Sequence, residues 1–324
     1  MIIKTLELNK VLLSVKNNSI GTINGTFDLL HKGHVDGINQ AKNKVDHLFI
    51  LVNDDKSVKR YKGPLRPIES IETRMNKLNR KFPNCYILHF SELTPIKILL
   101  KINPNIHFVS EDWGESPVEN YFLKNTRIIL IKKNYDISTS KKIGKAKIKE
   151  NLNYGVFLDR DGTITKDNNY INTLRNFSFL ENSIDGMLAL SKKKFKLIVV
   201  TNQSAVSKGL IEKKDALAFN RKIVTDSKKF GININQIYTS YSDSDSSPYR
   251  KPNNKFLELA ADKFGLALSR SWFIGDKETD MLTGKLSNTK TIFIGDQKNV
   301  NSKLVDYFTK DLFSASKIIL DNTV

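Results

Sequence analysis

Two short strings in the 324-residue chain carry residue types suited to phosphate chemistry. The first, IGTINGTFDLLHKGH, places His31 and His34 three positions apart after a glycine turn. The second, YGVFLDRDGTIT, is an apolar run that ends in the carboxylates of Asp159 and Asp161. Imidazoles can donate hydrogen bonds to phosphate, whereas carboxylates can attack phosphorus or hold a cation. The sequence therefore predicts two phosphate-handling sites of different chemistry.

The first string predicts a phosphate cradle between a strand and a helix. The strand ends at Asn24, and Gly25 lets the backbone approach a ligand closely. A helix that begins near Gly33 would offer free N–H groups and its positive dipole end to an anion. One helical turn would direct His31 and His34 at the same phosphate, where they could stabilise a leaving pyrophosphate. The alternative is that these histidines are a helix cap and a packed side chain.

The second string predicts carboxylate chemistry at a strand end. Asp159 and Asp161 are two positions apart and can face one cation, with Gly162 allowing a sharp turn. A D-x-D-G-T string alone also fits a calcium loop or a plain turn. All five histidines and the single cysteine, Cys85, lie before residue 150. The second half of the chain therefore has no histidine base and no thiolate, which leaves carboxylates and lysine to do the chemistry.

Strand and helix patterns alternate along the whole chain, which predicts an α/β fold with parallel sheets in two Rossmann-like domains. A polar, basic segment at 140–153 separates the two series, so the predicted domains are 1–148 and 149–324. The predicted strands are 19–24, 47–53, 85–89, 107–110 and 127–132, then 154–159, 196–201, 236–240, 271–275 and 289–294.

Composition sets the broad class of the chain. Hydrophobic residues make up 40% and charged residues 27%, as in soluble globular proteins. No apolar run approaches the roughly 18 residues of a membrane span, and no signal-peptide core is present. One cysteine fits a reducing compartment, with the cytoplasm as the default. The net charge of +18 favours anionic partners, but no nucleic-acid module accompanies it, which disfavours nucleic acid. Whether the chain forms a homo-oligomer is left open by the sequence.

The string GTFDLLHKGH resembles the signature of the cytidylyltransferase-like nucleotidyltransferases, a HIGH-type Rossmann-like fold. NDDKSVKRYKGPLRPI, ETRMNKL and ISTS extend the resemblance toward the adenylyltransferase domain of ADP-heptose synthases. The resemblance implies Mg²⁺ and in-line attack of a sugar phosphate on a nucleoside triphosphate, without a protein nucleophile. With His31 and His34 as catalytic residues, the implied nucleotide-binding residues are Gly25, Thr26, Phe27, Asp28, Lys59, Lys62, Arg66, Arg74, Ser138, Thr139 and Ser140.

Two departures from that family leave the base open between adenine and cytosine. Heptose adenylyltransferases usually carry a K-G-G-D-Y-like segment where this chain has Glu111-Asp112-Trp113, which is closer to glycerol-phosphate cytidylyltransferases. Those cytidylyltransferases place a basic residue before I-S-T-T, where this chain has Asn134-Tyr135-Asp136.

The string DRDGT resembles the first motif of the haloacid dehalogenase superfamily, and the other motifs follow in order as IVVTNQ, YRKP and FIGDKETD. This resemblance implies Asp159 as nucleophile, Asp161 as acid and base, and Lys251 as the cation beside them. It also implies Mg²⁺ held by Asp159, Asp161 and Asp276, with Asp280 in support. The implied phosphate or substrate contacts are Thr201, Asn202, Gln203 and Arg250.

The motifs are most similar to the histidinol-phosphatase and heptose-bisphosphate-phosphatase branch. About 40 residues separate Asp159 from Thr201 and about 50 separate Thr201 from Lys251, too few for a large cap domain. The branch often holds zinc through Cys and His before R-K-P, whereas this chain has YSDSDSSPY there. We therefore expect no zinc.

Together the resemblances predict a bifunctional enzyme of sugar-nucleotide biosynthesis. The second domain would dephosphorylate a sugar bisphosphate, such as D-glycero-D-manno-heptose 1,7-bisphosphate. The first would transfer AMP from ATP to the sugar 1-phosphate. The alternatives are a CTP-dependent enzyme that makes a CDP-polyol or CDP-sugar, a nucleic-acid end-processing phosphatase, and a non-catalytic binding protein.

Overall fold

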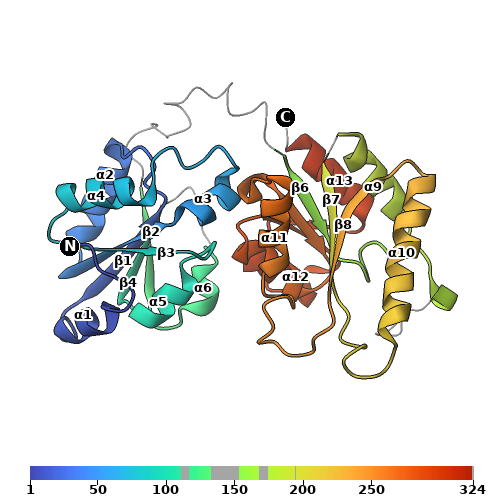
Figure 1. The fold of residues 1–324 in the computed structure, drawn as a ribbon, viewed down its shortest axis with the longest axis horizontal. Coiled ribbons are helices and arrows are strands. Elements are labelled where there is room, and N and C mark those ends of the chain that lie inside the picture. Colours follow the sequence, from blue (N-terminus) through green and yellow to red (C-terminus); the bar gives the residue numbers. More distant parts are fainter. Residues whose placement is uncertain (111–116, 133–152, 168–173, 194, 323–324) are drawn as a thin grey trace. The chain divides into compact units, whose positions relative to one another are not determined.

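The computed structural model describes residues 1–110, 117–132, 153–167, 174–193 and 195–322. The chain divides into two compact units, Met1–Leu152 and Asn153–Val324, each built around its own sheet (Figure 1). The predicted boundary after residue 148 lies outside the described residues and stays a prediction.

The sheet of the first unit has five parallel strands in the order β3-β2-β1-β4-β5. Central β2, HLFILVN, is buried at all but its first residue, because helices cover both faces of such sheets. The strands are β1 (Ile20–Gly25), β2 (His47–Asn53), β3 (Tyr86–Phe90), β4 (Ile106–Ser110) and β5 (Arg127–Ile131).

Two hydrophobic clusters hold helices against the two faces of this sheet. One cluster joins Ile38 and Leu78, from α2 (Lys32–Lys42) and α4 (Ile71–Lys81), to inward-facing strand residues. The other joins Leu8 and Leu99 to the opposite face. The helices on that face are α1 (Leu8–Ser14), α5 (Ile96–Ile102) and α6 (Glu119–Phe122), while α3 (Asp55–Lys62) follows β2.

The sheet of the second unit has six parallel strands in the order β11-β10-β9-β6-β7-β8. The strands are β6 (Gly155–Leu158), β7 (Lys196–Asn202), β8 (Ile234–Ser240), β9 (Trp272–Gly275), β10 (Lys290–Ile294) and β11 (Tyr307–Thr309).

Helices also cover both faces of the second sheet (Figure 1). One core cluster packs Leu190, Phe219 and Ala315 against alternate strand residues, and these side chains come from α9 (Ser183–Lys192), α10 (Lys213–Lys229) and α13 (Leu312–Asp321). On the other face lie α11 (Lys255–Phe264) and α12 (Glu278–Leu286), which contact β7 and β9 respectively. Short 3-10 turns occupy Leu174–Asn176, Leu268–Arg270, Gln297–Asn299 and Ser302–Leu304.

All ten predicted strands are confirmed, and the predicted pair of parallel α/β sheets is confirmed with them. The strand that the sequence did not reveal is β11, a half-buried edge strand of three residues. Within the described residues no helix has the length and apolar character needed to cross a bilayer. Because the strands are parallel, the residues that follow β6, β7 and β9 meet at one edge of the second sheet.

Candidate functional site

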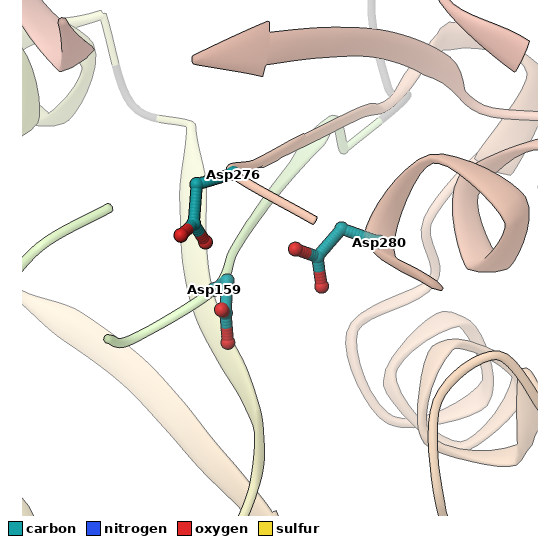
Figure 2. Close-up of side chains that lie close together, drawn as sticks. All are labelled: Asp159, Asp276 and Asp280. Carbon is teal, nitrogen blue, oxygen red and sulfur yellow. The ribbon is translucent and has the colours of Figure 1, made fainter. Parts of the chain in front are cut away.

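Three carboxylates of the second unit converge at this edge (Figure 2). One oxygen from each of Asp159, Asp276 and Asp280 lies within 4.8 Å of the others. Asp159 directly follows β6, Asp276 directly follows β9, and Asp280 lies in the first turn of α12. Asp159 and Asp280 are buried, so their charges are poorly screened by water.

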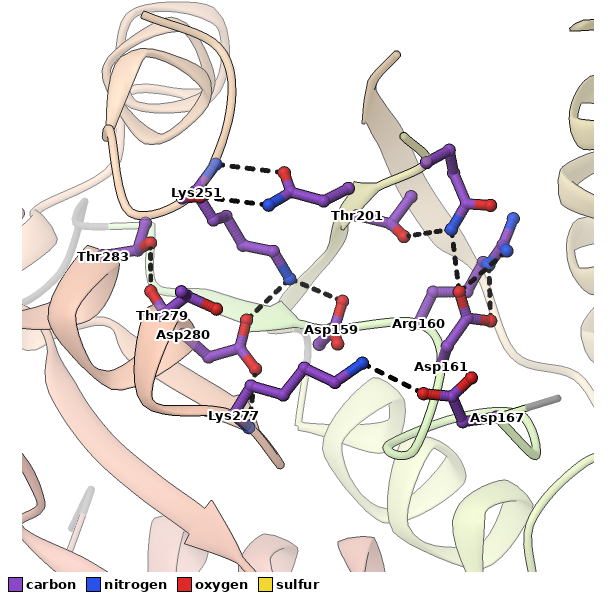
Figure 3. A network of polar contacts seen from close by, with 12 residues as sticks. Asp159, Arg160, Asp161, Asp167, Thr201, Lys251, Lys277, Thr279, Asp280 and Thr283 are labelled. Carbon is purple, nitrogen blue, oxygen red and sulfur yellow. Dashed lines mark hydrogen bonds and ion pairs between the residues drawn. The ribbon is translucent and has the colours of Figure 1, made fainter. Parts of the chain in front are cut away.

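One lysine joins two of these carboxylates (Figure 3). The Lys251 ammonium lies 2.6 Å from Asp159 Oδ1 and 2.6 Å from Asp280 Oδ1. Burial disfavours its charge, but the carboxylates of Asp159 and Asp280 outweigh that effect and raise the pKa of Lys251. The structure thus places a lysine cation beside Asp159, while the nucleophile role of Asp159 stays a prediction.

Asp276 is the carboxylate of this group that Lys251 does not contact. Burial, followed by the negative charges of Asp159 and Asp280, raises the pKa of Asp276 to about 8. Asp276 Oδ1 is buried and has no hydrogen-bond partner within the described part of the chain. Clustered carboxylate oxygens with an unsatisfied buried acceptor are the donor set that a hard divalent cation prefers. These residues therefore fit Mg²⁺.

Two glycines let the backbone approach these carboxylates. A Cβ atom at Gly162 would lie 2.1 Å from Asp276 Oδ2, and Gly162 has a φ of +84°, in the left-handed region. A Cβ atom at Gly275 would lie 2.3 Å from Asp280 Oδ2. Any side chain at either position would displace a carboxylate of the group.

The structure places Asp280, and not Asp161, beside Asp159 and Asp276, while the metal-binding roles of these residues stay predictions. Asp280, expected in a supporting position, belongs to the three-carboxylate group, and Asp161 does not. Asp161 instead accepts hydrogen bonds from Arg160 at 2.9 and 2.8 Å and from Gln203 at 2.7 Å (Figure 3). The side chain is drawn to those donors because they satisfy both of its oxygens.

The predicted phosphate-binding residues at the end of β7 differ in their contacts. Asn202 donates to the backbone carbonyl of Lys251 at 3.0 Å and accepts from its backbone N–H at 3.0 Å. Its amide is thus occupied in holding Lys251, rather than directed at a phosphoryl group. Thr201 is buried and accepts a hydrogen bond from Gln203 at 2.9 Å.

Arg250 braces the loop that precedes it. Its Nε donates to Asp245 at 3.2 Å and its Nη1 to the carbonyl of Ser242 at 3.1 Å. Asn253 donates to the carbonyls of Asp245 and Ser247 at 2.8 and 2.9 Å. These bonds hold residues 241–249, at the position where the resembling branch often binds zinc. The predicted contact of Arg250 with a substrate would have to form while its guanidinium keeps the bonds to Asp245 and Ser242.

In the first unit the two predicted histidines lie together at the start of α2. Their rings stack with centroids 3.6 Å apart, and the Phe27 ring meets His34 edge-on at 5.4 Å. His31 is also the N-cap, because its Nδ1 accepts from the backbone N–H of His34 at 3.4 Å. His31 therefore caps the helix, as in the alternative interpretation, and its role toward a phosphate stays a prediction.

Three of the predicted nucleotide-binding residues are buried and make hydrogen bonds or ion pairs within the first unit. Asp28 is buried, pairs with Arg66 Nη2 at 2.6 Å, and accepts from the backbone N–H of Ile68 and Glu69. Arg74 is 0% exposed and donates to the carbonyls of Thr26, Asn53 and Glu69 and to Asp55. Arg66 and Arg74 thus direct guanidinium nitrogens at partners inside the unit, and their predicted phosphate contacts stay predictions.

The remaining predicted residues of this site are less constrained. Lys62 lies 3.1 Å from the Thr26 hydroxyl, and Lys59 is exposed on α3. The Phe27 ring folds over Gly25, where a Cβ atom would meet it at 3.0 Å. Phe27 and Leu29 have positive φ angles of 47° and 52°, a strained backbone at the predicted cradle. Ser138, Thr139 and Ser140, and the base-discriminating residues 111–113 and 134–136, lie outside the described residues.

Sequence reasoning missed two cations beside the carboxylates of the second unit. Arg160 is fully buried and contacts Asp161, although arginine between two aspartates reads as a surface residue. Lys277 donates to Asp167 at 3.0 Å. Burial opposes the charge of Lys277, but the carboxylates of Asp159 and Asp276 outweigh that effect and raise its pKa. Both residues are next in sequence to a predicted metal ligand, and this position is the signal that could have identified them.

Family models match both halves of the chain. Residues 22–157 match the cytidylyltransferase-like family, and residues 156–320, a little over half of the chain, match the polynucleotide kinase 3 phosphatase family. The chain thus contains a cytidylyltransferase-like domain followed by a haloacid dehalogenase-like phosphatase domain, as predicted.

Similar proteins include the bifunctional protein HldE of Pseudomonas entomophila and of Azotobacter vinelandii, each 38% identical over 114 residues, or 34% of this chain. The chain spans only about a quarter, 24%, of the length of these relatives. Similar structures include a D,D-heptose 1,7-bisphosphate phosphatase from B. bronchiseptica, with 18% identity over 52% of this chain and 98% of that one, and a TM-score of 0.46. A lipopolysaccharide core biosynthesis protein from Thermoplasma volcanium has 21% identity over 37% and 100%, and a TM-score of 0.33.

Proposed function

Because the chain belongs to the polynucleotide kinase 3 phosphatase family and carries a cytidylyltransferase-like domain, we propose that it is a bifunctional phosphatase and nucleotidyltransferase. The observation that carries the phosphatase half is the buried group in which Lys251 joins Asp159 and Asp280 beside Asp276. A buried carboxylate at a strand end with a lysine at 2.6 Å is equipped to attack and retain a phosphoryl group.

The proposed reaction of the second unit has two steps. An oxygen of Asp159 attacks phosphorus, the bond to the leaving alkoxide breaks, and Asp161 gives that alkoxide a proton. Water then attacks the aspartyl-phosphate, giving its proton to Asp161, and the bond between phosphorus and Asp159 breaks. Inorganic phosphate leaves and both aspartates return to their starting states.

Asp159, Asp276 and Asp280 would hold Mg²⁺ in this reaction. The cation would supply positive charge against the phosphoryl oxygens and would balance the excess of carboxylates over lysine. Lys251 keeps the nucleophile oriented through its bond to Asp159, and Asn202 fixes Lys251 in turn.

The proposed reaction of the first unit is nucleotidyl transfer. A sugar phosphate attacks the α-phosphate of a nucleoside triphosphate and pyrophosphate leaves, with no protein nucleophile. His31 and His34 stand at the start of α2, where the helix dipole and the imidazole nitrogens favour the developing negative charge. Lys62 and Lys59 are the cations of α3 that remain candidates for phosphate contacts, with Mg²⁺ sharing the charge.

The proposed substrates are D-glycero-D-manno-heptose 1,7-bisphosphate for the phosphatase and the resulting heptose 1-phosphate with ATP for the transferase. The similarity of the first unit to HldE and the heptose-phosphatase resemblance of the second point to consecutive steps on one sugar. A paired assay tests this, with phosphate release measured on sugar bisphosphates and pyrophosphate release on each sugar 1-phosphate with ATP or CTP. Transfer from CTP alone would replace the ADP-heptose proposal with a CDP-sugar or CDP-polyol one.

Nucleic-acid end processing is the second candidate function. The family description of residues 156–320 and the net charge of +18 favour it. A 3′-phosphorylated oligonucleotide in the same phosphate-release assay distinguishes the two. Release from the oligonucleotide at a rate equal to or above that from the heptose bisphosphate would contradict the sugar proposal.

A further inference from the structure

Arg160 sits between the two motif aspartates and is 0% exposed. Its guanidinium forms a two-pronged contact with the neighbouring carboxylate, Nε donating to Asp161 Oδ1 at 2.9 Å and Nη2 to Oδ2 at 2.8 Å. Figure 3 shows Arg160 directed at Asp161 on the side of the site opposite Lys251. No step of the proposed reaction yet uses this buried cation.

The chain fixes Arg160 from two further directions. Nη1 donates to Asn220 Oδ1 at 2.9 Å, and the guanidinium lies over the Phe219 ring at 4.5 Å. Asn220 is oriented in turn, because its Nδ2 donates to the Thr239 hydroxyl at 3.0 Å. Arg160 thus has one well-defined position, set by α10 and β8 as well as by Asp161 of its own loop.

Asp161 is surrounded by donors. Besides Arg160, its Oδ1 accepts from the Thr165 hydroxyl at 3.2 Å and its Oδ2 from Gln203 Nε2 at 2.7 Å. These donors contact both oxygens of Asp161 and set the direction of its carboxylate. Only Arg160 engages both oxygens, and the planar fork of arginine specifies an angle that a lysine would not.

We propose that Arg160 is a positioning residue for Asp161, fixing the direction from which that carboxylate passes protons to the leaving oxygen and from the attacking water. The inference rests on the proposed phosphatase function and adds a role for a residue that contacts Asp161, Asn220 and Phe219. Burying an ion pair is weak support for stability. Its rigid geometry beside a proton-transferring carboxylate is instead what positioned acid–base chemistry requires.

The test separates the two chemical steps with p-nitrophenyl phosphate, whose leaving group departs without a proton. In Mg²⁺ buffer, Arg160→Lys and Arg160→Gln should still transfer phosphate to Asp159, which releases about one p-nitrophenolate per site in a burst. Hydrolysis of the aspartyl-phosphate needs Asp161, so steady-state turnover should fall about 100-fold. On the heptose bisphosphate both steps need Asp161, so the same loss should appear without a burst of product.

Two further variants complete the experiment. Asn220→Leu removes the acceptor that holds Arg160 and should show a burst with about a 10-fold loss of turnover; it carries the test if the Arg160 variants do not fold. Arg221→Gln changes an exposed arginine on the same helix and should match the wild type. Steady-state turnover within threefold of wild type in folded Arg160 variants would overturn the inference. Loss of burst and turnover together would also overturn it, because that pattern places the damage at Asp159. A wild type with no phosphatase activity would instead refute the proposed function.

Discussion

Replacing Gly162 with alanine adds one methyl group where the loop after β6 meets Asp276. An ideal Cβ atom at Gly162 would lie 2.1 Å from Asp276 Oδ2 and 2.5 Å from its carboxyl carbon. These separations are far inside van der Waals contact, and the carboxyl group of Asp276 belongs to a short side chain with little room to move. We expect Gly162→Ala to push Asp276 out of the three-carboxylate group and to cost at least about 100-fold in phosphate release.

The same substitution carries a second cost that can be measured separately. Gly162 has a φ of +84°, where an L-residue is disfavoured by roughly 1–2 kcal/mol. Gly231, after α10, has a φ of +75° and no atom within 4 Å of its ideal Cβ position. Gly231→Ala is therefore a matched control that carries the backbone strain without the collision.

The assay pairs stability with activity. Urea unfolding of both variants gives the free energy of unfolding, and phosphate release is recorded as Mg²⁺ is raised from micromolar to tens of millimolar. We expect both variants to lose roughly 1–2 kcal/mol of stability. Only Gly162→Ala should lose activity and need more Mg²⁺. Equal activity in the two variants at equal Mg²⁺ would refute the argument that Gly162 is required for the approach to Asp276.

Three further outcomes follow from contacts in the two units. Asp159→Asn should lower phosphate release by about four orders of magnitude while pyrophosphate release is unchanged, and loss of both in one assay would contradict two independent sites. Burial lowers the pKa of His107 to about 3, so below about pH 6.5 the unfolded chain binds a proton at this residue that the native state does not bind. The free energy of unfolding of the first unit should therefore fall by about 2 kcal/mol between pH 7 and pH 5. His107→Gln should flatten this pH dependence in denaturant titrations. Arg74→Lys loses the bonds to Thr26 and Asn53 and should lower the free energy of unfolding by about 3 kcal/mol, and an unchanged urea midpoint would show that these bonds are dispensable.

The sheets were predictable because most of their strands contain a short apolar run that is bounded by polar residues. β2 and β7 are continuous hydrophobic stretches, as strands covered on both faces require. The edge strand β11, YFT, has three half-buried residues and therefore lacks such a run. Short edge strands depend on the neighbouring strand for their identity, which a local pattern does not carry.

The site was predictable in its residue types but not in its pairings. Asp159 and Asp276 lie together because the ends of the parallel strands β6 and β9 share an edge, and Lys251 reaches Asp159 from the loop after β8. Whether Arg74 faces a phosphate or three backbone carbonyls depends on loops brought together by the fold. A basic residue near a predicted phosphate site therefore indicates where the site lies, but it does not show whether that residue contacts the phosphate.

The uneven distribution of histidine between the two units makes them chemically distinguishable. All five histidines of the chain precede residue 150, and two of them stack at the start of α2. Any property specific to imidazole therefore reports on the first unit, because the second unit contains no histidine. Isotope-labelled histidine would likewise give magnetic resonance signals from the first unit alone. Labelled histidine would thus provide a selective reporter of nucleotide binding in the intact chain, even while the phosphatase half is turning over.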